Sequence, residues 1–300
     1  MKDTWVKKGL VVSVILLFIG VTVAPSINSS LASQNIIVIN DVSPRSSFGL
    51  QSEIYLSWDA NQTSEPLHVD FARSIPLNVT YDCIKGTFGQ FILFYYILTR
   101  KSINISLEVE DKPSWCHAYL SNSHLHFPIT GTSTTYSIHL VIAVDFNAPA
   151  FEPFSVKIKA SAHDMIGPLG FLTLINGVEI TQDIIFEAEY VPSIGIIPES
   201  VYLETQPGNT VIDPITVYNS GNGKTIVDIE PIDVPQNWLV IINPLILEIN
   251  ESKITNLSIT PPIDFYGNET ILLSFTPKFY YNPIYTGIPI DVLITVEVRP

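Results

Sequence analysis

From residue 35 onward, apolar and polar side chains alternate along most of the chain. This pattern is typical of half-buried β-strands, in which successive side chains point to opposite faces of a sheet. The clearest alternating segments are 77–83, 103–110, 138–144, 154–160, 271–275 and 294–299. Beyond the N-terminal region, no stretch shows the helical spacing of about 3.6 residues. The pattern therefore predicts an all-β protein.

A strand-like segment followed by proline and then tryptophan occurs twice, ending at Trp115 and at Trp238. In each half, an Asp-Phe pair and a further alternating segment follow the tryptophan. The repeat distance of about 120 residues suits a duplicated β-sandwich, for which ~100 residues is usual. We therefore expect two tandem sandwiches, at 35–190 and 191–300, joined by the proline-containing segment 190–199.

The first 32 residues have the features of an export signal. Three lysines precede an apolar run at 9–24, and Ser30-Leu31-Ala32 fits the small-x-small cleavage pattern. A helix formed by this run would be about 24 Å long. The hydrocarbon core of a bilayer is about 30 Å thick and needs ~20 helical residues to span it, so the run is short for a membrane span. We expect residues 1–32 to be a signal peptide cleaved near Ala32, or a signal retained as a membrane anchor. Either outcome places the rest of the protein outside the cytoplasm, secreted or at the cell surface.

Composition narrows the function classes. The chain is 46% hydrophobic and only 15% charged, with a net charge of −14. Such hydrophobicity excludes intrinsic disorder, and so few Lys and Arg residues argue against nucleic-acid binding. No nucleophile elbow, metalloprotease helix, phosphate-binding glycine loop or calcium-loop spacing occurs. We expect a non-enzymatic protein without a cofactor or catalytic residues.

Cys83 and Cys116 are the only cysteines, and both lie on strand-like segments whose alternation points them inward. In an extracytoplasmic protein such a pair predicts a disulfide, which would be worth about 3–4 kcal/mol in the chain-entropy model. The alternative is a pair of buried free thiols.

Seven Asn-x-Ser/Thr sequons occur, more than chance gives for this composition. Asn28 falls within the predicted signal. The glycosylation candidates in the remaining chain are Asn61, Asn78, Asn104, Asn250, Asn256 and Asn268. The alternative is that a chain rich in Asn and Thr contains these sequons by accident.

His124 and His126 lie on the same side of a predicted strand, where they could supply two ligands of a metal site. A third ligand, such as His117 or His139, would have to come from a neighbouring strand. Surface histidines are the simpler interpretation, and we assign no metal site.

Three connections between strands are unusually apolar and aromatic, at 91–98, 165–175 and 279–288. Connections are normally polar. The first two would lie at the same end of a sandwich and form one apolar patch. The alternative is that they fold back as extra strands or pack on the other domain. The contact-patch candidates are Phe91, Phe94, Tyr95, Phe171, Leu172, Tyr280 and Tyr281.

The second half carries a specific pattern of turns. A Pro-Gly turn at 207–208 precedes a long strand that begins the segment Ile215-Thr-Val-Tyr-Asn-Ser-Gly-Asn-Gly223, and an Asn-x-Gly turn ends that segment. Val234-Pro-Gln-Asn-Trp238 then starts a later strand. Over 194–300 this resembles the immunoglobulin-like modules of secreted archaeal and other microbial cell-surface proteins. The cell-adhesion-related bacterial domain and the β-sandwich associated with α-galactosidases are similar. The resemblance is looser over 35–190, where Pro113-Ser-Trp115 is one residue shorter.

The resemblance implies two tandem immunoglobulin-like antiparallel β-sandwiches after an N-terminal signal or hydrophobic helix. It also implies adhesive or structural protein contacts at the cell surface or envelope, with membrane attachment through the N-terminal segment as one route. The partner is a protein or an envelope polymer of unknown identity. The alternative function is carbohydrate binding, for which Trp58, Tyr280, Tyr281 and Tyr285 are the candidate stacking residues.

Overall fold

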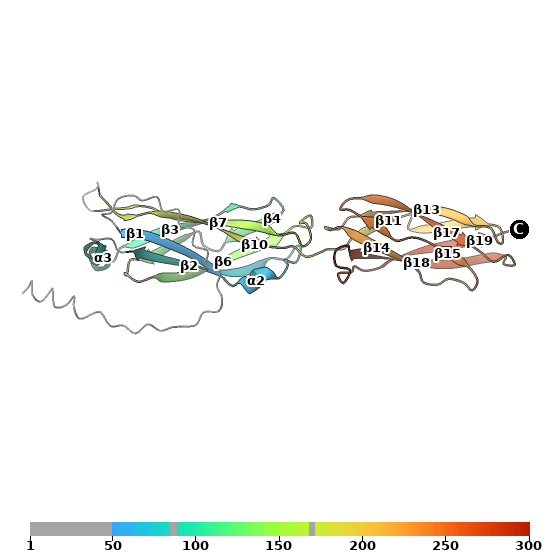
Figure 1. The fold of residues 1–300 in the computed structure, drawn as a ribbon, viewed down its shortest axis with the longest axis horizontal. Helices are drawn as coiled ribbons and strands as arrows, with labels where there is room; N and C mark the ends of the chain where they lie inside the picture. The colour runs from blue at the N-terminus through green and yellow to red at the C-terminus, as the bar shows by residue number, and fades with distance from the viewer. Residues whose placement is uncertain (1–49, 85–88, 168–171) are drawn as a thin grey trace, which may run out of the picture. The chain divides into compact units, whose positions relative to one another are not determined.

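A computed structural model describes residues 50–84, 89–167 and 172–300, and these ranges form an all-β protein (Figure 1). The predicted signal at 1–32 lies outside the described residues, as does Asn28. Four sheets build two β-sandwiches. None of the helices in the described ranges is long and apolar enough to cross a membrane.

The first sandwich pairs the sheet β4-β6-β2-β1-β9-β8 with the sheet β10-β7-β3-β5. Its elements are β1 (Leu50–Trp58), α2 (Ala60–Ser64), β2 (Arg73–Ile84), α3 (Gly89–Leu98), β3 (Ser102–Asp111), β4 (Cys116–Leu120), β5 (His124–Pro128), β6 (Thr134–Val144), β7 (Phe154–Ala162), β8 (Met165–Ile166), β9 (Thr173–Asn176) and β10 (Val178–Phe186).

The second sandwich pairs the sheet β11-β13-β17-β15 with the sheet β12-β19-β18-β14-β16. Its strands are β11 (Ile194–Ile197), β12 (Ser200–Thr205), β13 (Val211–Asn219), β14 (Thr225–Pro231), β15 (Leu239–Ile241), β16 (Leu245–Leu247), β17 (Ser252–Thr260), β18 (Gly267–Phe279) and β19 (Ile290–Val298).

The two sandwiches share one immunoglobulin-like strand order. The order β1-β2-β6-β4 in the first corresponds to β11-β13-β17-β15 in the second, and β10-β7-β3-β5 corresponds to β19-β18-β14-β16. These are the two sheets of an immunoglobulin-type sandwich. Two parallel pairings modify the expected antiparallel arrangement, since β12 runs parallel to β19 and β9 runs parallel to β1. The internal repeat seen in the sequence is thus a repeat of topology.

The alternating apolar positions fill the interiors, as their period predicts. On β7, for example, Phe154, Val156, Ile158 and Ala160 are buried, while the residues between them face outward or are half-buried. Each sandwich has its own cluster of buried hydrophobic residues. Because residues alternate in this way, each sheet has one apolar face and one polar face. The apolar face has to be buried against a partner sheet, which explains why two layers form.

The repeated tryptophans occupy corresponding places, directly before β4 and β15. Trp115 packs edge-on against Phe154 at 4.7 Å, and Trp238 packs edge-on against Phe265 at 5.2 Å between ring centroids. The Asp-Phe repeat does not correspond in the same way, because Phe146 is exposed and Phe154 takes the position against Trp115. The sequence repeat therefore predicts the equivalent positions of the two tryptophans, but it does not predict the aromatic residue on which each one packs.

The turn between β13 and β14 contacts segments of both sandwiches. The buried Asn222 side chain accepts from the backbone N–H of Val191 (2.7 Å) and donates to the carbonyl oxygens of Ala148 (2.9 Å) and Glu189 (2.8 Å). A Cβ on the neighbouring Gly223 would lie 3.0 Å from atoms of both Tyr190 and Phe279, so this position has little room for a side chain. The asparagine-glycine turn predicted from the sequence is thus a buried junction.

Residues 89–98 form the helix α3, whereas the sequence predicted no helix after the signal. The helix ends in a Schellman motif, in which Lys101 N–H donates to the Tyr96 carbonyl and Arg100 N–H to the Ile97 carbonyl. Arg100 has the positive φ of 50° that this ending requires. The sequence pattern does not predict this helix, because nearly all of its side chains are apolar and the 3.6-residue alternation of apolar and polar positions is therefore missing.

The predicted disulfide is wrong: Cys83 and Cys116 are both free and buried. Both lie in the same sheet, but Tyr81, next but one to Cys83, pairs with Thr134, whereas Cys116 pairs with Val144. Thr134 and Val144 are opposite ends of β6, and a strand of that length spans roughly 35 Å. A disulfide needs Cα atoms within about 7 Å, so this register forbids the bond. The alternative of buried free thiols holds.

Candidate contact surface

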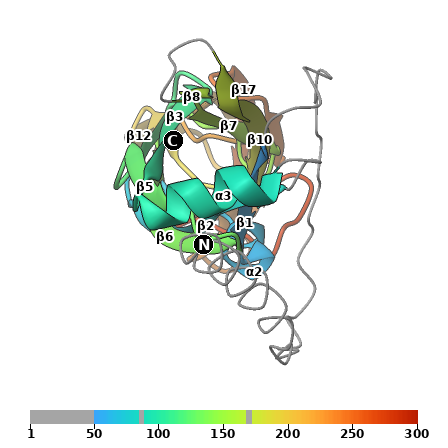
Figure 2. The same cartoon turned by 90° about the vertical axis from the view of Figure 1, so that its left-hand side faces the viewer.

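The helix α3 lies across one end of the first sandwich (Figure 2). Its inner side buries Gly89, Leu93 and Tyr96. Its outer side exposes Phe91 (77% exposed) and Leu98 (70%) to solvent. Phe94, Tyr95 and Ile97 are also exposed. A helix that is apolar all round is normally buried, so the outer side of α3 needs an explanation.

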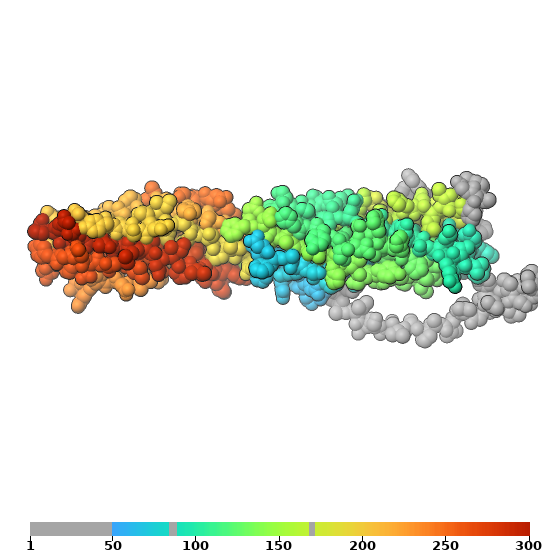
Figure 3. Space-filling model, turned by 180° about the vertical axis from the view of Figure 1, so that it is seen from behind, coloured from blue at the N-terminus to red at the C-terminus, as the bar shows by residue number. Residues whose placement is uncertain are grey.

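The second apolar connection reaches the same end of the sandwich. Gln51 at the start of β1 pairs with Ile84, close to the beginning of α3, and Leu50 pairs with Ile175 of β9. Ile166 and Leu172 are both exposed there. Phe171 lies outside the described residues. Atoms of α3, drawn in teal, form part of the surface at this end in the space-filling view (Figure 3).

The charge around α3 differs from that of the rest of the chain. No Asp or Glu occurs between Asp82 and Glu108, although the whole chain has 29 such residues. Arg100 and Lys101 are exposed directly after the helix. The Schellman ending fixes their backbone there, where cations are also favoured by the helix dipole. The apolar end therefore carries a small basic edge on an acidic protein.

The third apolar connection, between β18 and β19, forms a separate patch. Tyr281, Ile284 and Ile288 are strongly exposed. The rings of Tyr280 and Tyr281 are perpendicular, with an interplanar angle of 89°, and Lys224 lies 4.5 Å above the Tyr280 ring. Tyr285 packs on Phe151 at 4.7 Å.

Trp58, the remaining stacking candidate, packs against the core of the first sandwich. The four aromatic candidates for sugar stacking thus do not form a flat strip.

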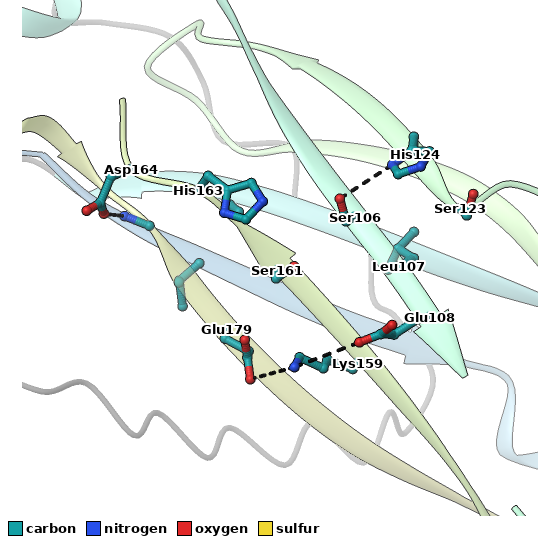
Figure 4. Close-up of a pocket in the computed structure, with 13 residues that line it drawn as sticks. Ser106, Leu107, Glu108, Ser123, His124, Lys159, Ser161, His163, Asp164 and Glu179 are labelled. Atoms are coloured by element: carbon teal, nitrogen blue, oxygen red, sulfur yellow. Dashed lines mark hydrogen bonds and ion pairs between the residues drawn. The ribbon is translucent and has the colours of Figure 1, made fainter. Parts of the chain in front are cut away.

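A polar groove of about 950 Å³ crosses the outer face of the sheet β10-β7-β3-β5 (Figure 4). Among the residues that line it, Lys159 binds Glu179 (3.0 Å) and lies 3.8 Å from Glu108. The hydrogen bond that Lys159 donates to Glu179 raises the pKa of Lys159, and the charge of Glu108 adds to this effect. Lys159 is therefore held between two carboxylates, and its charge is already compensated.

The histidines singled out in the sequence lie on strand surfaces with polar partners. His124 and His126 are both exposed on β5, near Ser106 and Asn104 of β3 respectively. His117 binds Asp145 at 3.0 Å instead. His139 contacts Ser74 at 3.2 Å. Within the described ranges, no three His, Cys, Asp or Glu side chains are grouped so that they could hold a metal ion.

The sequon asparagines are distributed over both sandwiches. Asn78 is half-buried on β2. The other five are exposed: Asn61, Asn104, Asn250, Asn256 and Asn268. The Asn104 side chain is engaged with His126 on the groove-bearing sheet. This contact uses Oδ1 of Asn104 and not Nδ2, the atom to which an N-linked glycan is attached.

No protein-family model matches the chain, and no curated protein matches it. Among solved structures, cadherin domains 3–6 of protocadherin gamma B2 align with 13% identity, 83% of this chain, 51% of that chain and a TM-score of 0.41. The D00-D0 domain of intimin aligns with 12% identity, 82% of this chain, 100% of that chain and a TM-score of 0.29. The PapD-like domain 7 of human CEP192 aligns with 11% identity, 35% of this chain, 84% of that chain and a TM-score of 0.30. These similarities are distant.

Proposed function

We propose that this chain is an exported, non-enzymatic protein of the cell surface or envelope, whose β-sandwiches make adhesive or structural contacts. The observation that carries the proposal is the exposed apolar side of α3 at one end of the first sandwich. A large apolar patch on an otherwise well-packed domain marks an interaction site. The resemblance to tandem modules of microbial surface proteins and the N-terminal export pattern support the same function.

The duplicated fold supports a structural role for the rest of the molecule. Each sandwich buries its own core, and the hydrogen bonds of Asn222 connect residues on both sides of the 187–193 segment. A buried polar side chain whose bonds are all satisfied favours one packing arrangement over others. The second sandwich thereby supports the first, which bears α3.

The proposal is tested by site-specific photo-crosslinking in the full chain, produced in a host that exports it. A photoreactive residue in place of Phe91 is expected to form adducts with envelope components in intact cells. The matched control replaces Tyr202, which is also an exposed aromatic but lies on β12 of the second sandwich. Adducts at position 91 no more abundant than those at position 202 would refute α3 as the contact surface.

A further inference from the structure

We infer that the surface contacted by α3 is an anionic lipid bilayer, on which the helix lies in the headgroup region. This inference rests on the proposed function and names the partner of the same surface. Its basis is the combination of an apolar outer side with a basic edge, on a helix whose inner side is anchored in the sandwich. The chain thus presents a preformed interfacial helix.

The first argument comes from the side chains of α3. The helix contains no charged residue, and the exposed set mixes aromatic rings with Ile97 and Leu98. Aromatic and aliphatic side chains on one side of a surface helix insert shallowly between lipid headgroups and acyl chains. With only 10 residues the helix is too short to span a bilayer, but it is long enough to lie in the interface.

The second argument is charge complementarity. Arg100 and Lys101 follow the helix at a fixed position, and the nearest acidic residues in the sequence are Asp82 and Glu108. Each cation near an anionic membrane surface strengthens binding roughly fivefold. Because the chain as a whole has a net charge of −14, an anionic surface repels most of it and attracts this edge. The charge distribution therefore orients α3 toward the lipid.

A second copy of the chain fits this surface less well. A symmetric dimer places the same patch of both subunits face to face. Arg100 and Lys101 of one copy would then face the α3 surface of the other, which offers no carboxylate to pair with them. Anionic lipid headgroups supply the missing negative charge.

The test places an environment-sensitive NBD fluorophore on a cysteine introduced in the full chain by Phe91→Cys. The matched control carries the fluorophore at Ile288→Cys, because Ile288 is 87% exposed and Lys278, which bridges Thr286 of the same connection, is paired with Asp228. Vesicles of phosphatidylcholine with phosphatidylglycerol are expected to shift the emission of the probe at position 91 to the blue and to increase it. Brominated lipids should quench the probe at position 91 and leave the probe at position 288 unchanged. Reading the probe at α3 separates this contact from any binding by residues 1–32.

Removing the positive charges of Arg100 and Lys101 provides a second test of the lipid contact. Arg100→Gln with Lys101→Gln is expected to weaken binding of the labelled α3 to anionic vesicles roughly 30-fold, and pure phosphatidylcholine should bind equally weakly to both proteins. An unchanged spectrum of the probe at position 91 on anionic vesicles overturns the lipid proposal. A change that depends on protein concentration without vesicles overturns it in favour of self-association. If photo-crosslinking at position 91 still yields envelope adducts in either case, the proposed function stands and only its lipid partner is wrong.

Discussion

The side-chain nitrogen Nδ2 of Asn222 donates a hydrogen bond to the carbonyl oxygen of Ala148, 2.9 Å away and 74 residues earlier in the chain. The same side chain also contacts the 189–191 segment, and the Asn222 backbone accepts from Ala150 N–H at 3.0 Å. A single buried asparagine thus satisfies backbone groups of the first sandwich and of the segment that leads into the second. No apolar residue can replace it, because each partner group would be left without water or a hydrogen bond.

Asn222→Ala is expected to lower the free energy of unfolding by about 3 kcal/mol, since it leaves buried backbone donors and acceptors unpaired. Urea denaturation followed by circular dichroism measures the change. Asn243→Ala is the matched control, because Asn243 is an exposed asparagine of the same sandwich. A loss at position 222 no larger than that at position 243 would contradict the role of Asn222 as a junction.

Tyr96→Phe is expected to stabilise the protein by about 1 kcal/mol. The Tyr96 hydroxyl is buried without a hydrogen-bond partner among the described residues, so its removal relieves a desolvation cost. Tyr81→Phe provides the contrast, because the Tyr81 hydroxyl binds Ser52 Oγ at 2.9 Å and Cys83 Sγ at 3.0 Å. That variant should lose about 1 kcal/mol. Thermal denaturation measures the stability of both variants. A Tyr96→Phe variant that is less stable than the wild type would show that the Tyr96 hydroxyl has a hydrogen-bond partner.

Both cysteines are expected to be alkylated by iodoacetamide in denaturant without any reductant. In the native protein the reaction should be far slower, because burial raises the pKa of both thiols, that of Cys116 to about 11. The reactive thiolate is therefore scarce at neutral pH, and access is blocked as well. Intact mass spectrometry counts the modified thiols. A protein that gains alkyl groups only after reduction would contain the disulfide that the strand register forbids.

Stability is expected to fall as the pH rises from about 9 to 11, in part because of Cys116. Its pKa is raised from 9.0 to about 11 on folding, so the unfolded chain releases the proton first. The stabilising contribution is complete below pH 9 and is lost as the pH passes through the folded-state value. Urea midpoints measured across this range should decline more steeply for the wild type than for Cys116→Ala. Equal slopes would show that Cys116 does not titrate differently in the two states.

The helix α3 shows where pattern reasoning failed. The sequence marks residues 91–98 as an unusually apolar connection, but an uninterrupted apolar run does not reveal whether it is helix or strand. Periodicity distinguishes helix from strand only when one side is polar. Here both sides are apolar, because the inner side packs on the sandwich and the outer side is exposed. The expectation that the 91–98 and 165–175 connections lie at one end needed only the strand order, and the pairings of β1 agree with it.

The prediction of a disulfide between Cys83 and Cys116 is wrong for a different reason. Alternation correctly predicted that Cys83 and Cys116 point inward, and both are buried. Their distance depends on which strands lie between them and in what register, which local sequence does not encode.

The sequence by itself determined the class of the fold, its duplication and the inward-facing side of each strand, because these follow from a local period of two and from turn residues. Only the tertiary structure decided the conformation of α3, the separation of the two thiols and the junction at Asn222. Each of these depends on contacts between segments far apart in the chain, such as the 74 residues between Ala148 and Asn222. Non-local packing therefore placed the basic edge of Arg100 and Lys101 beside an exposed apolar helix, and that placement defines the surface to be tested.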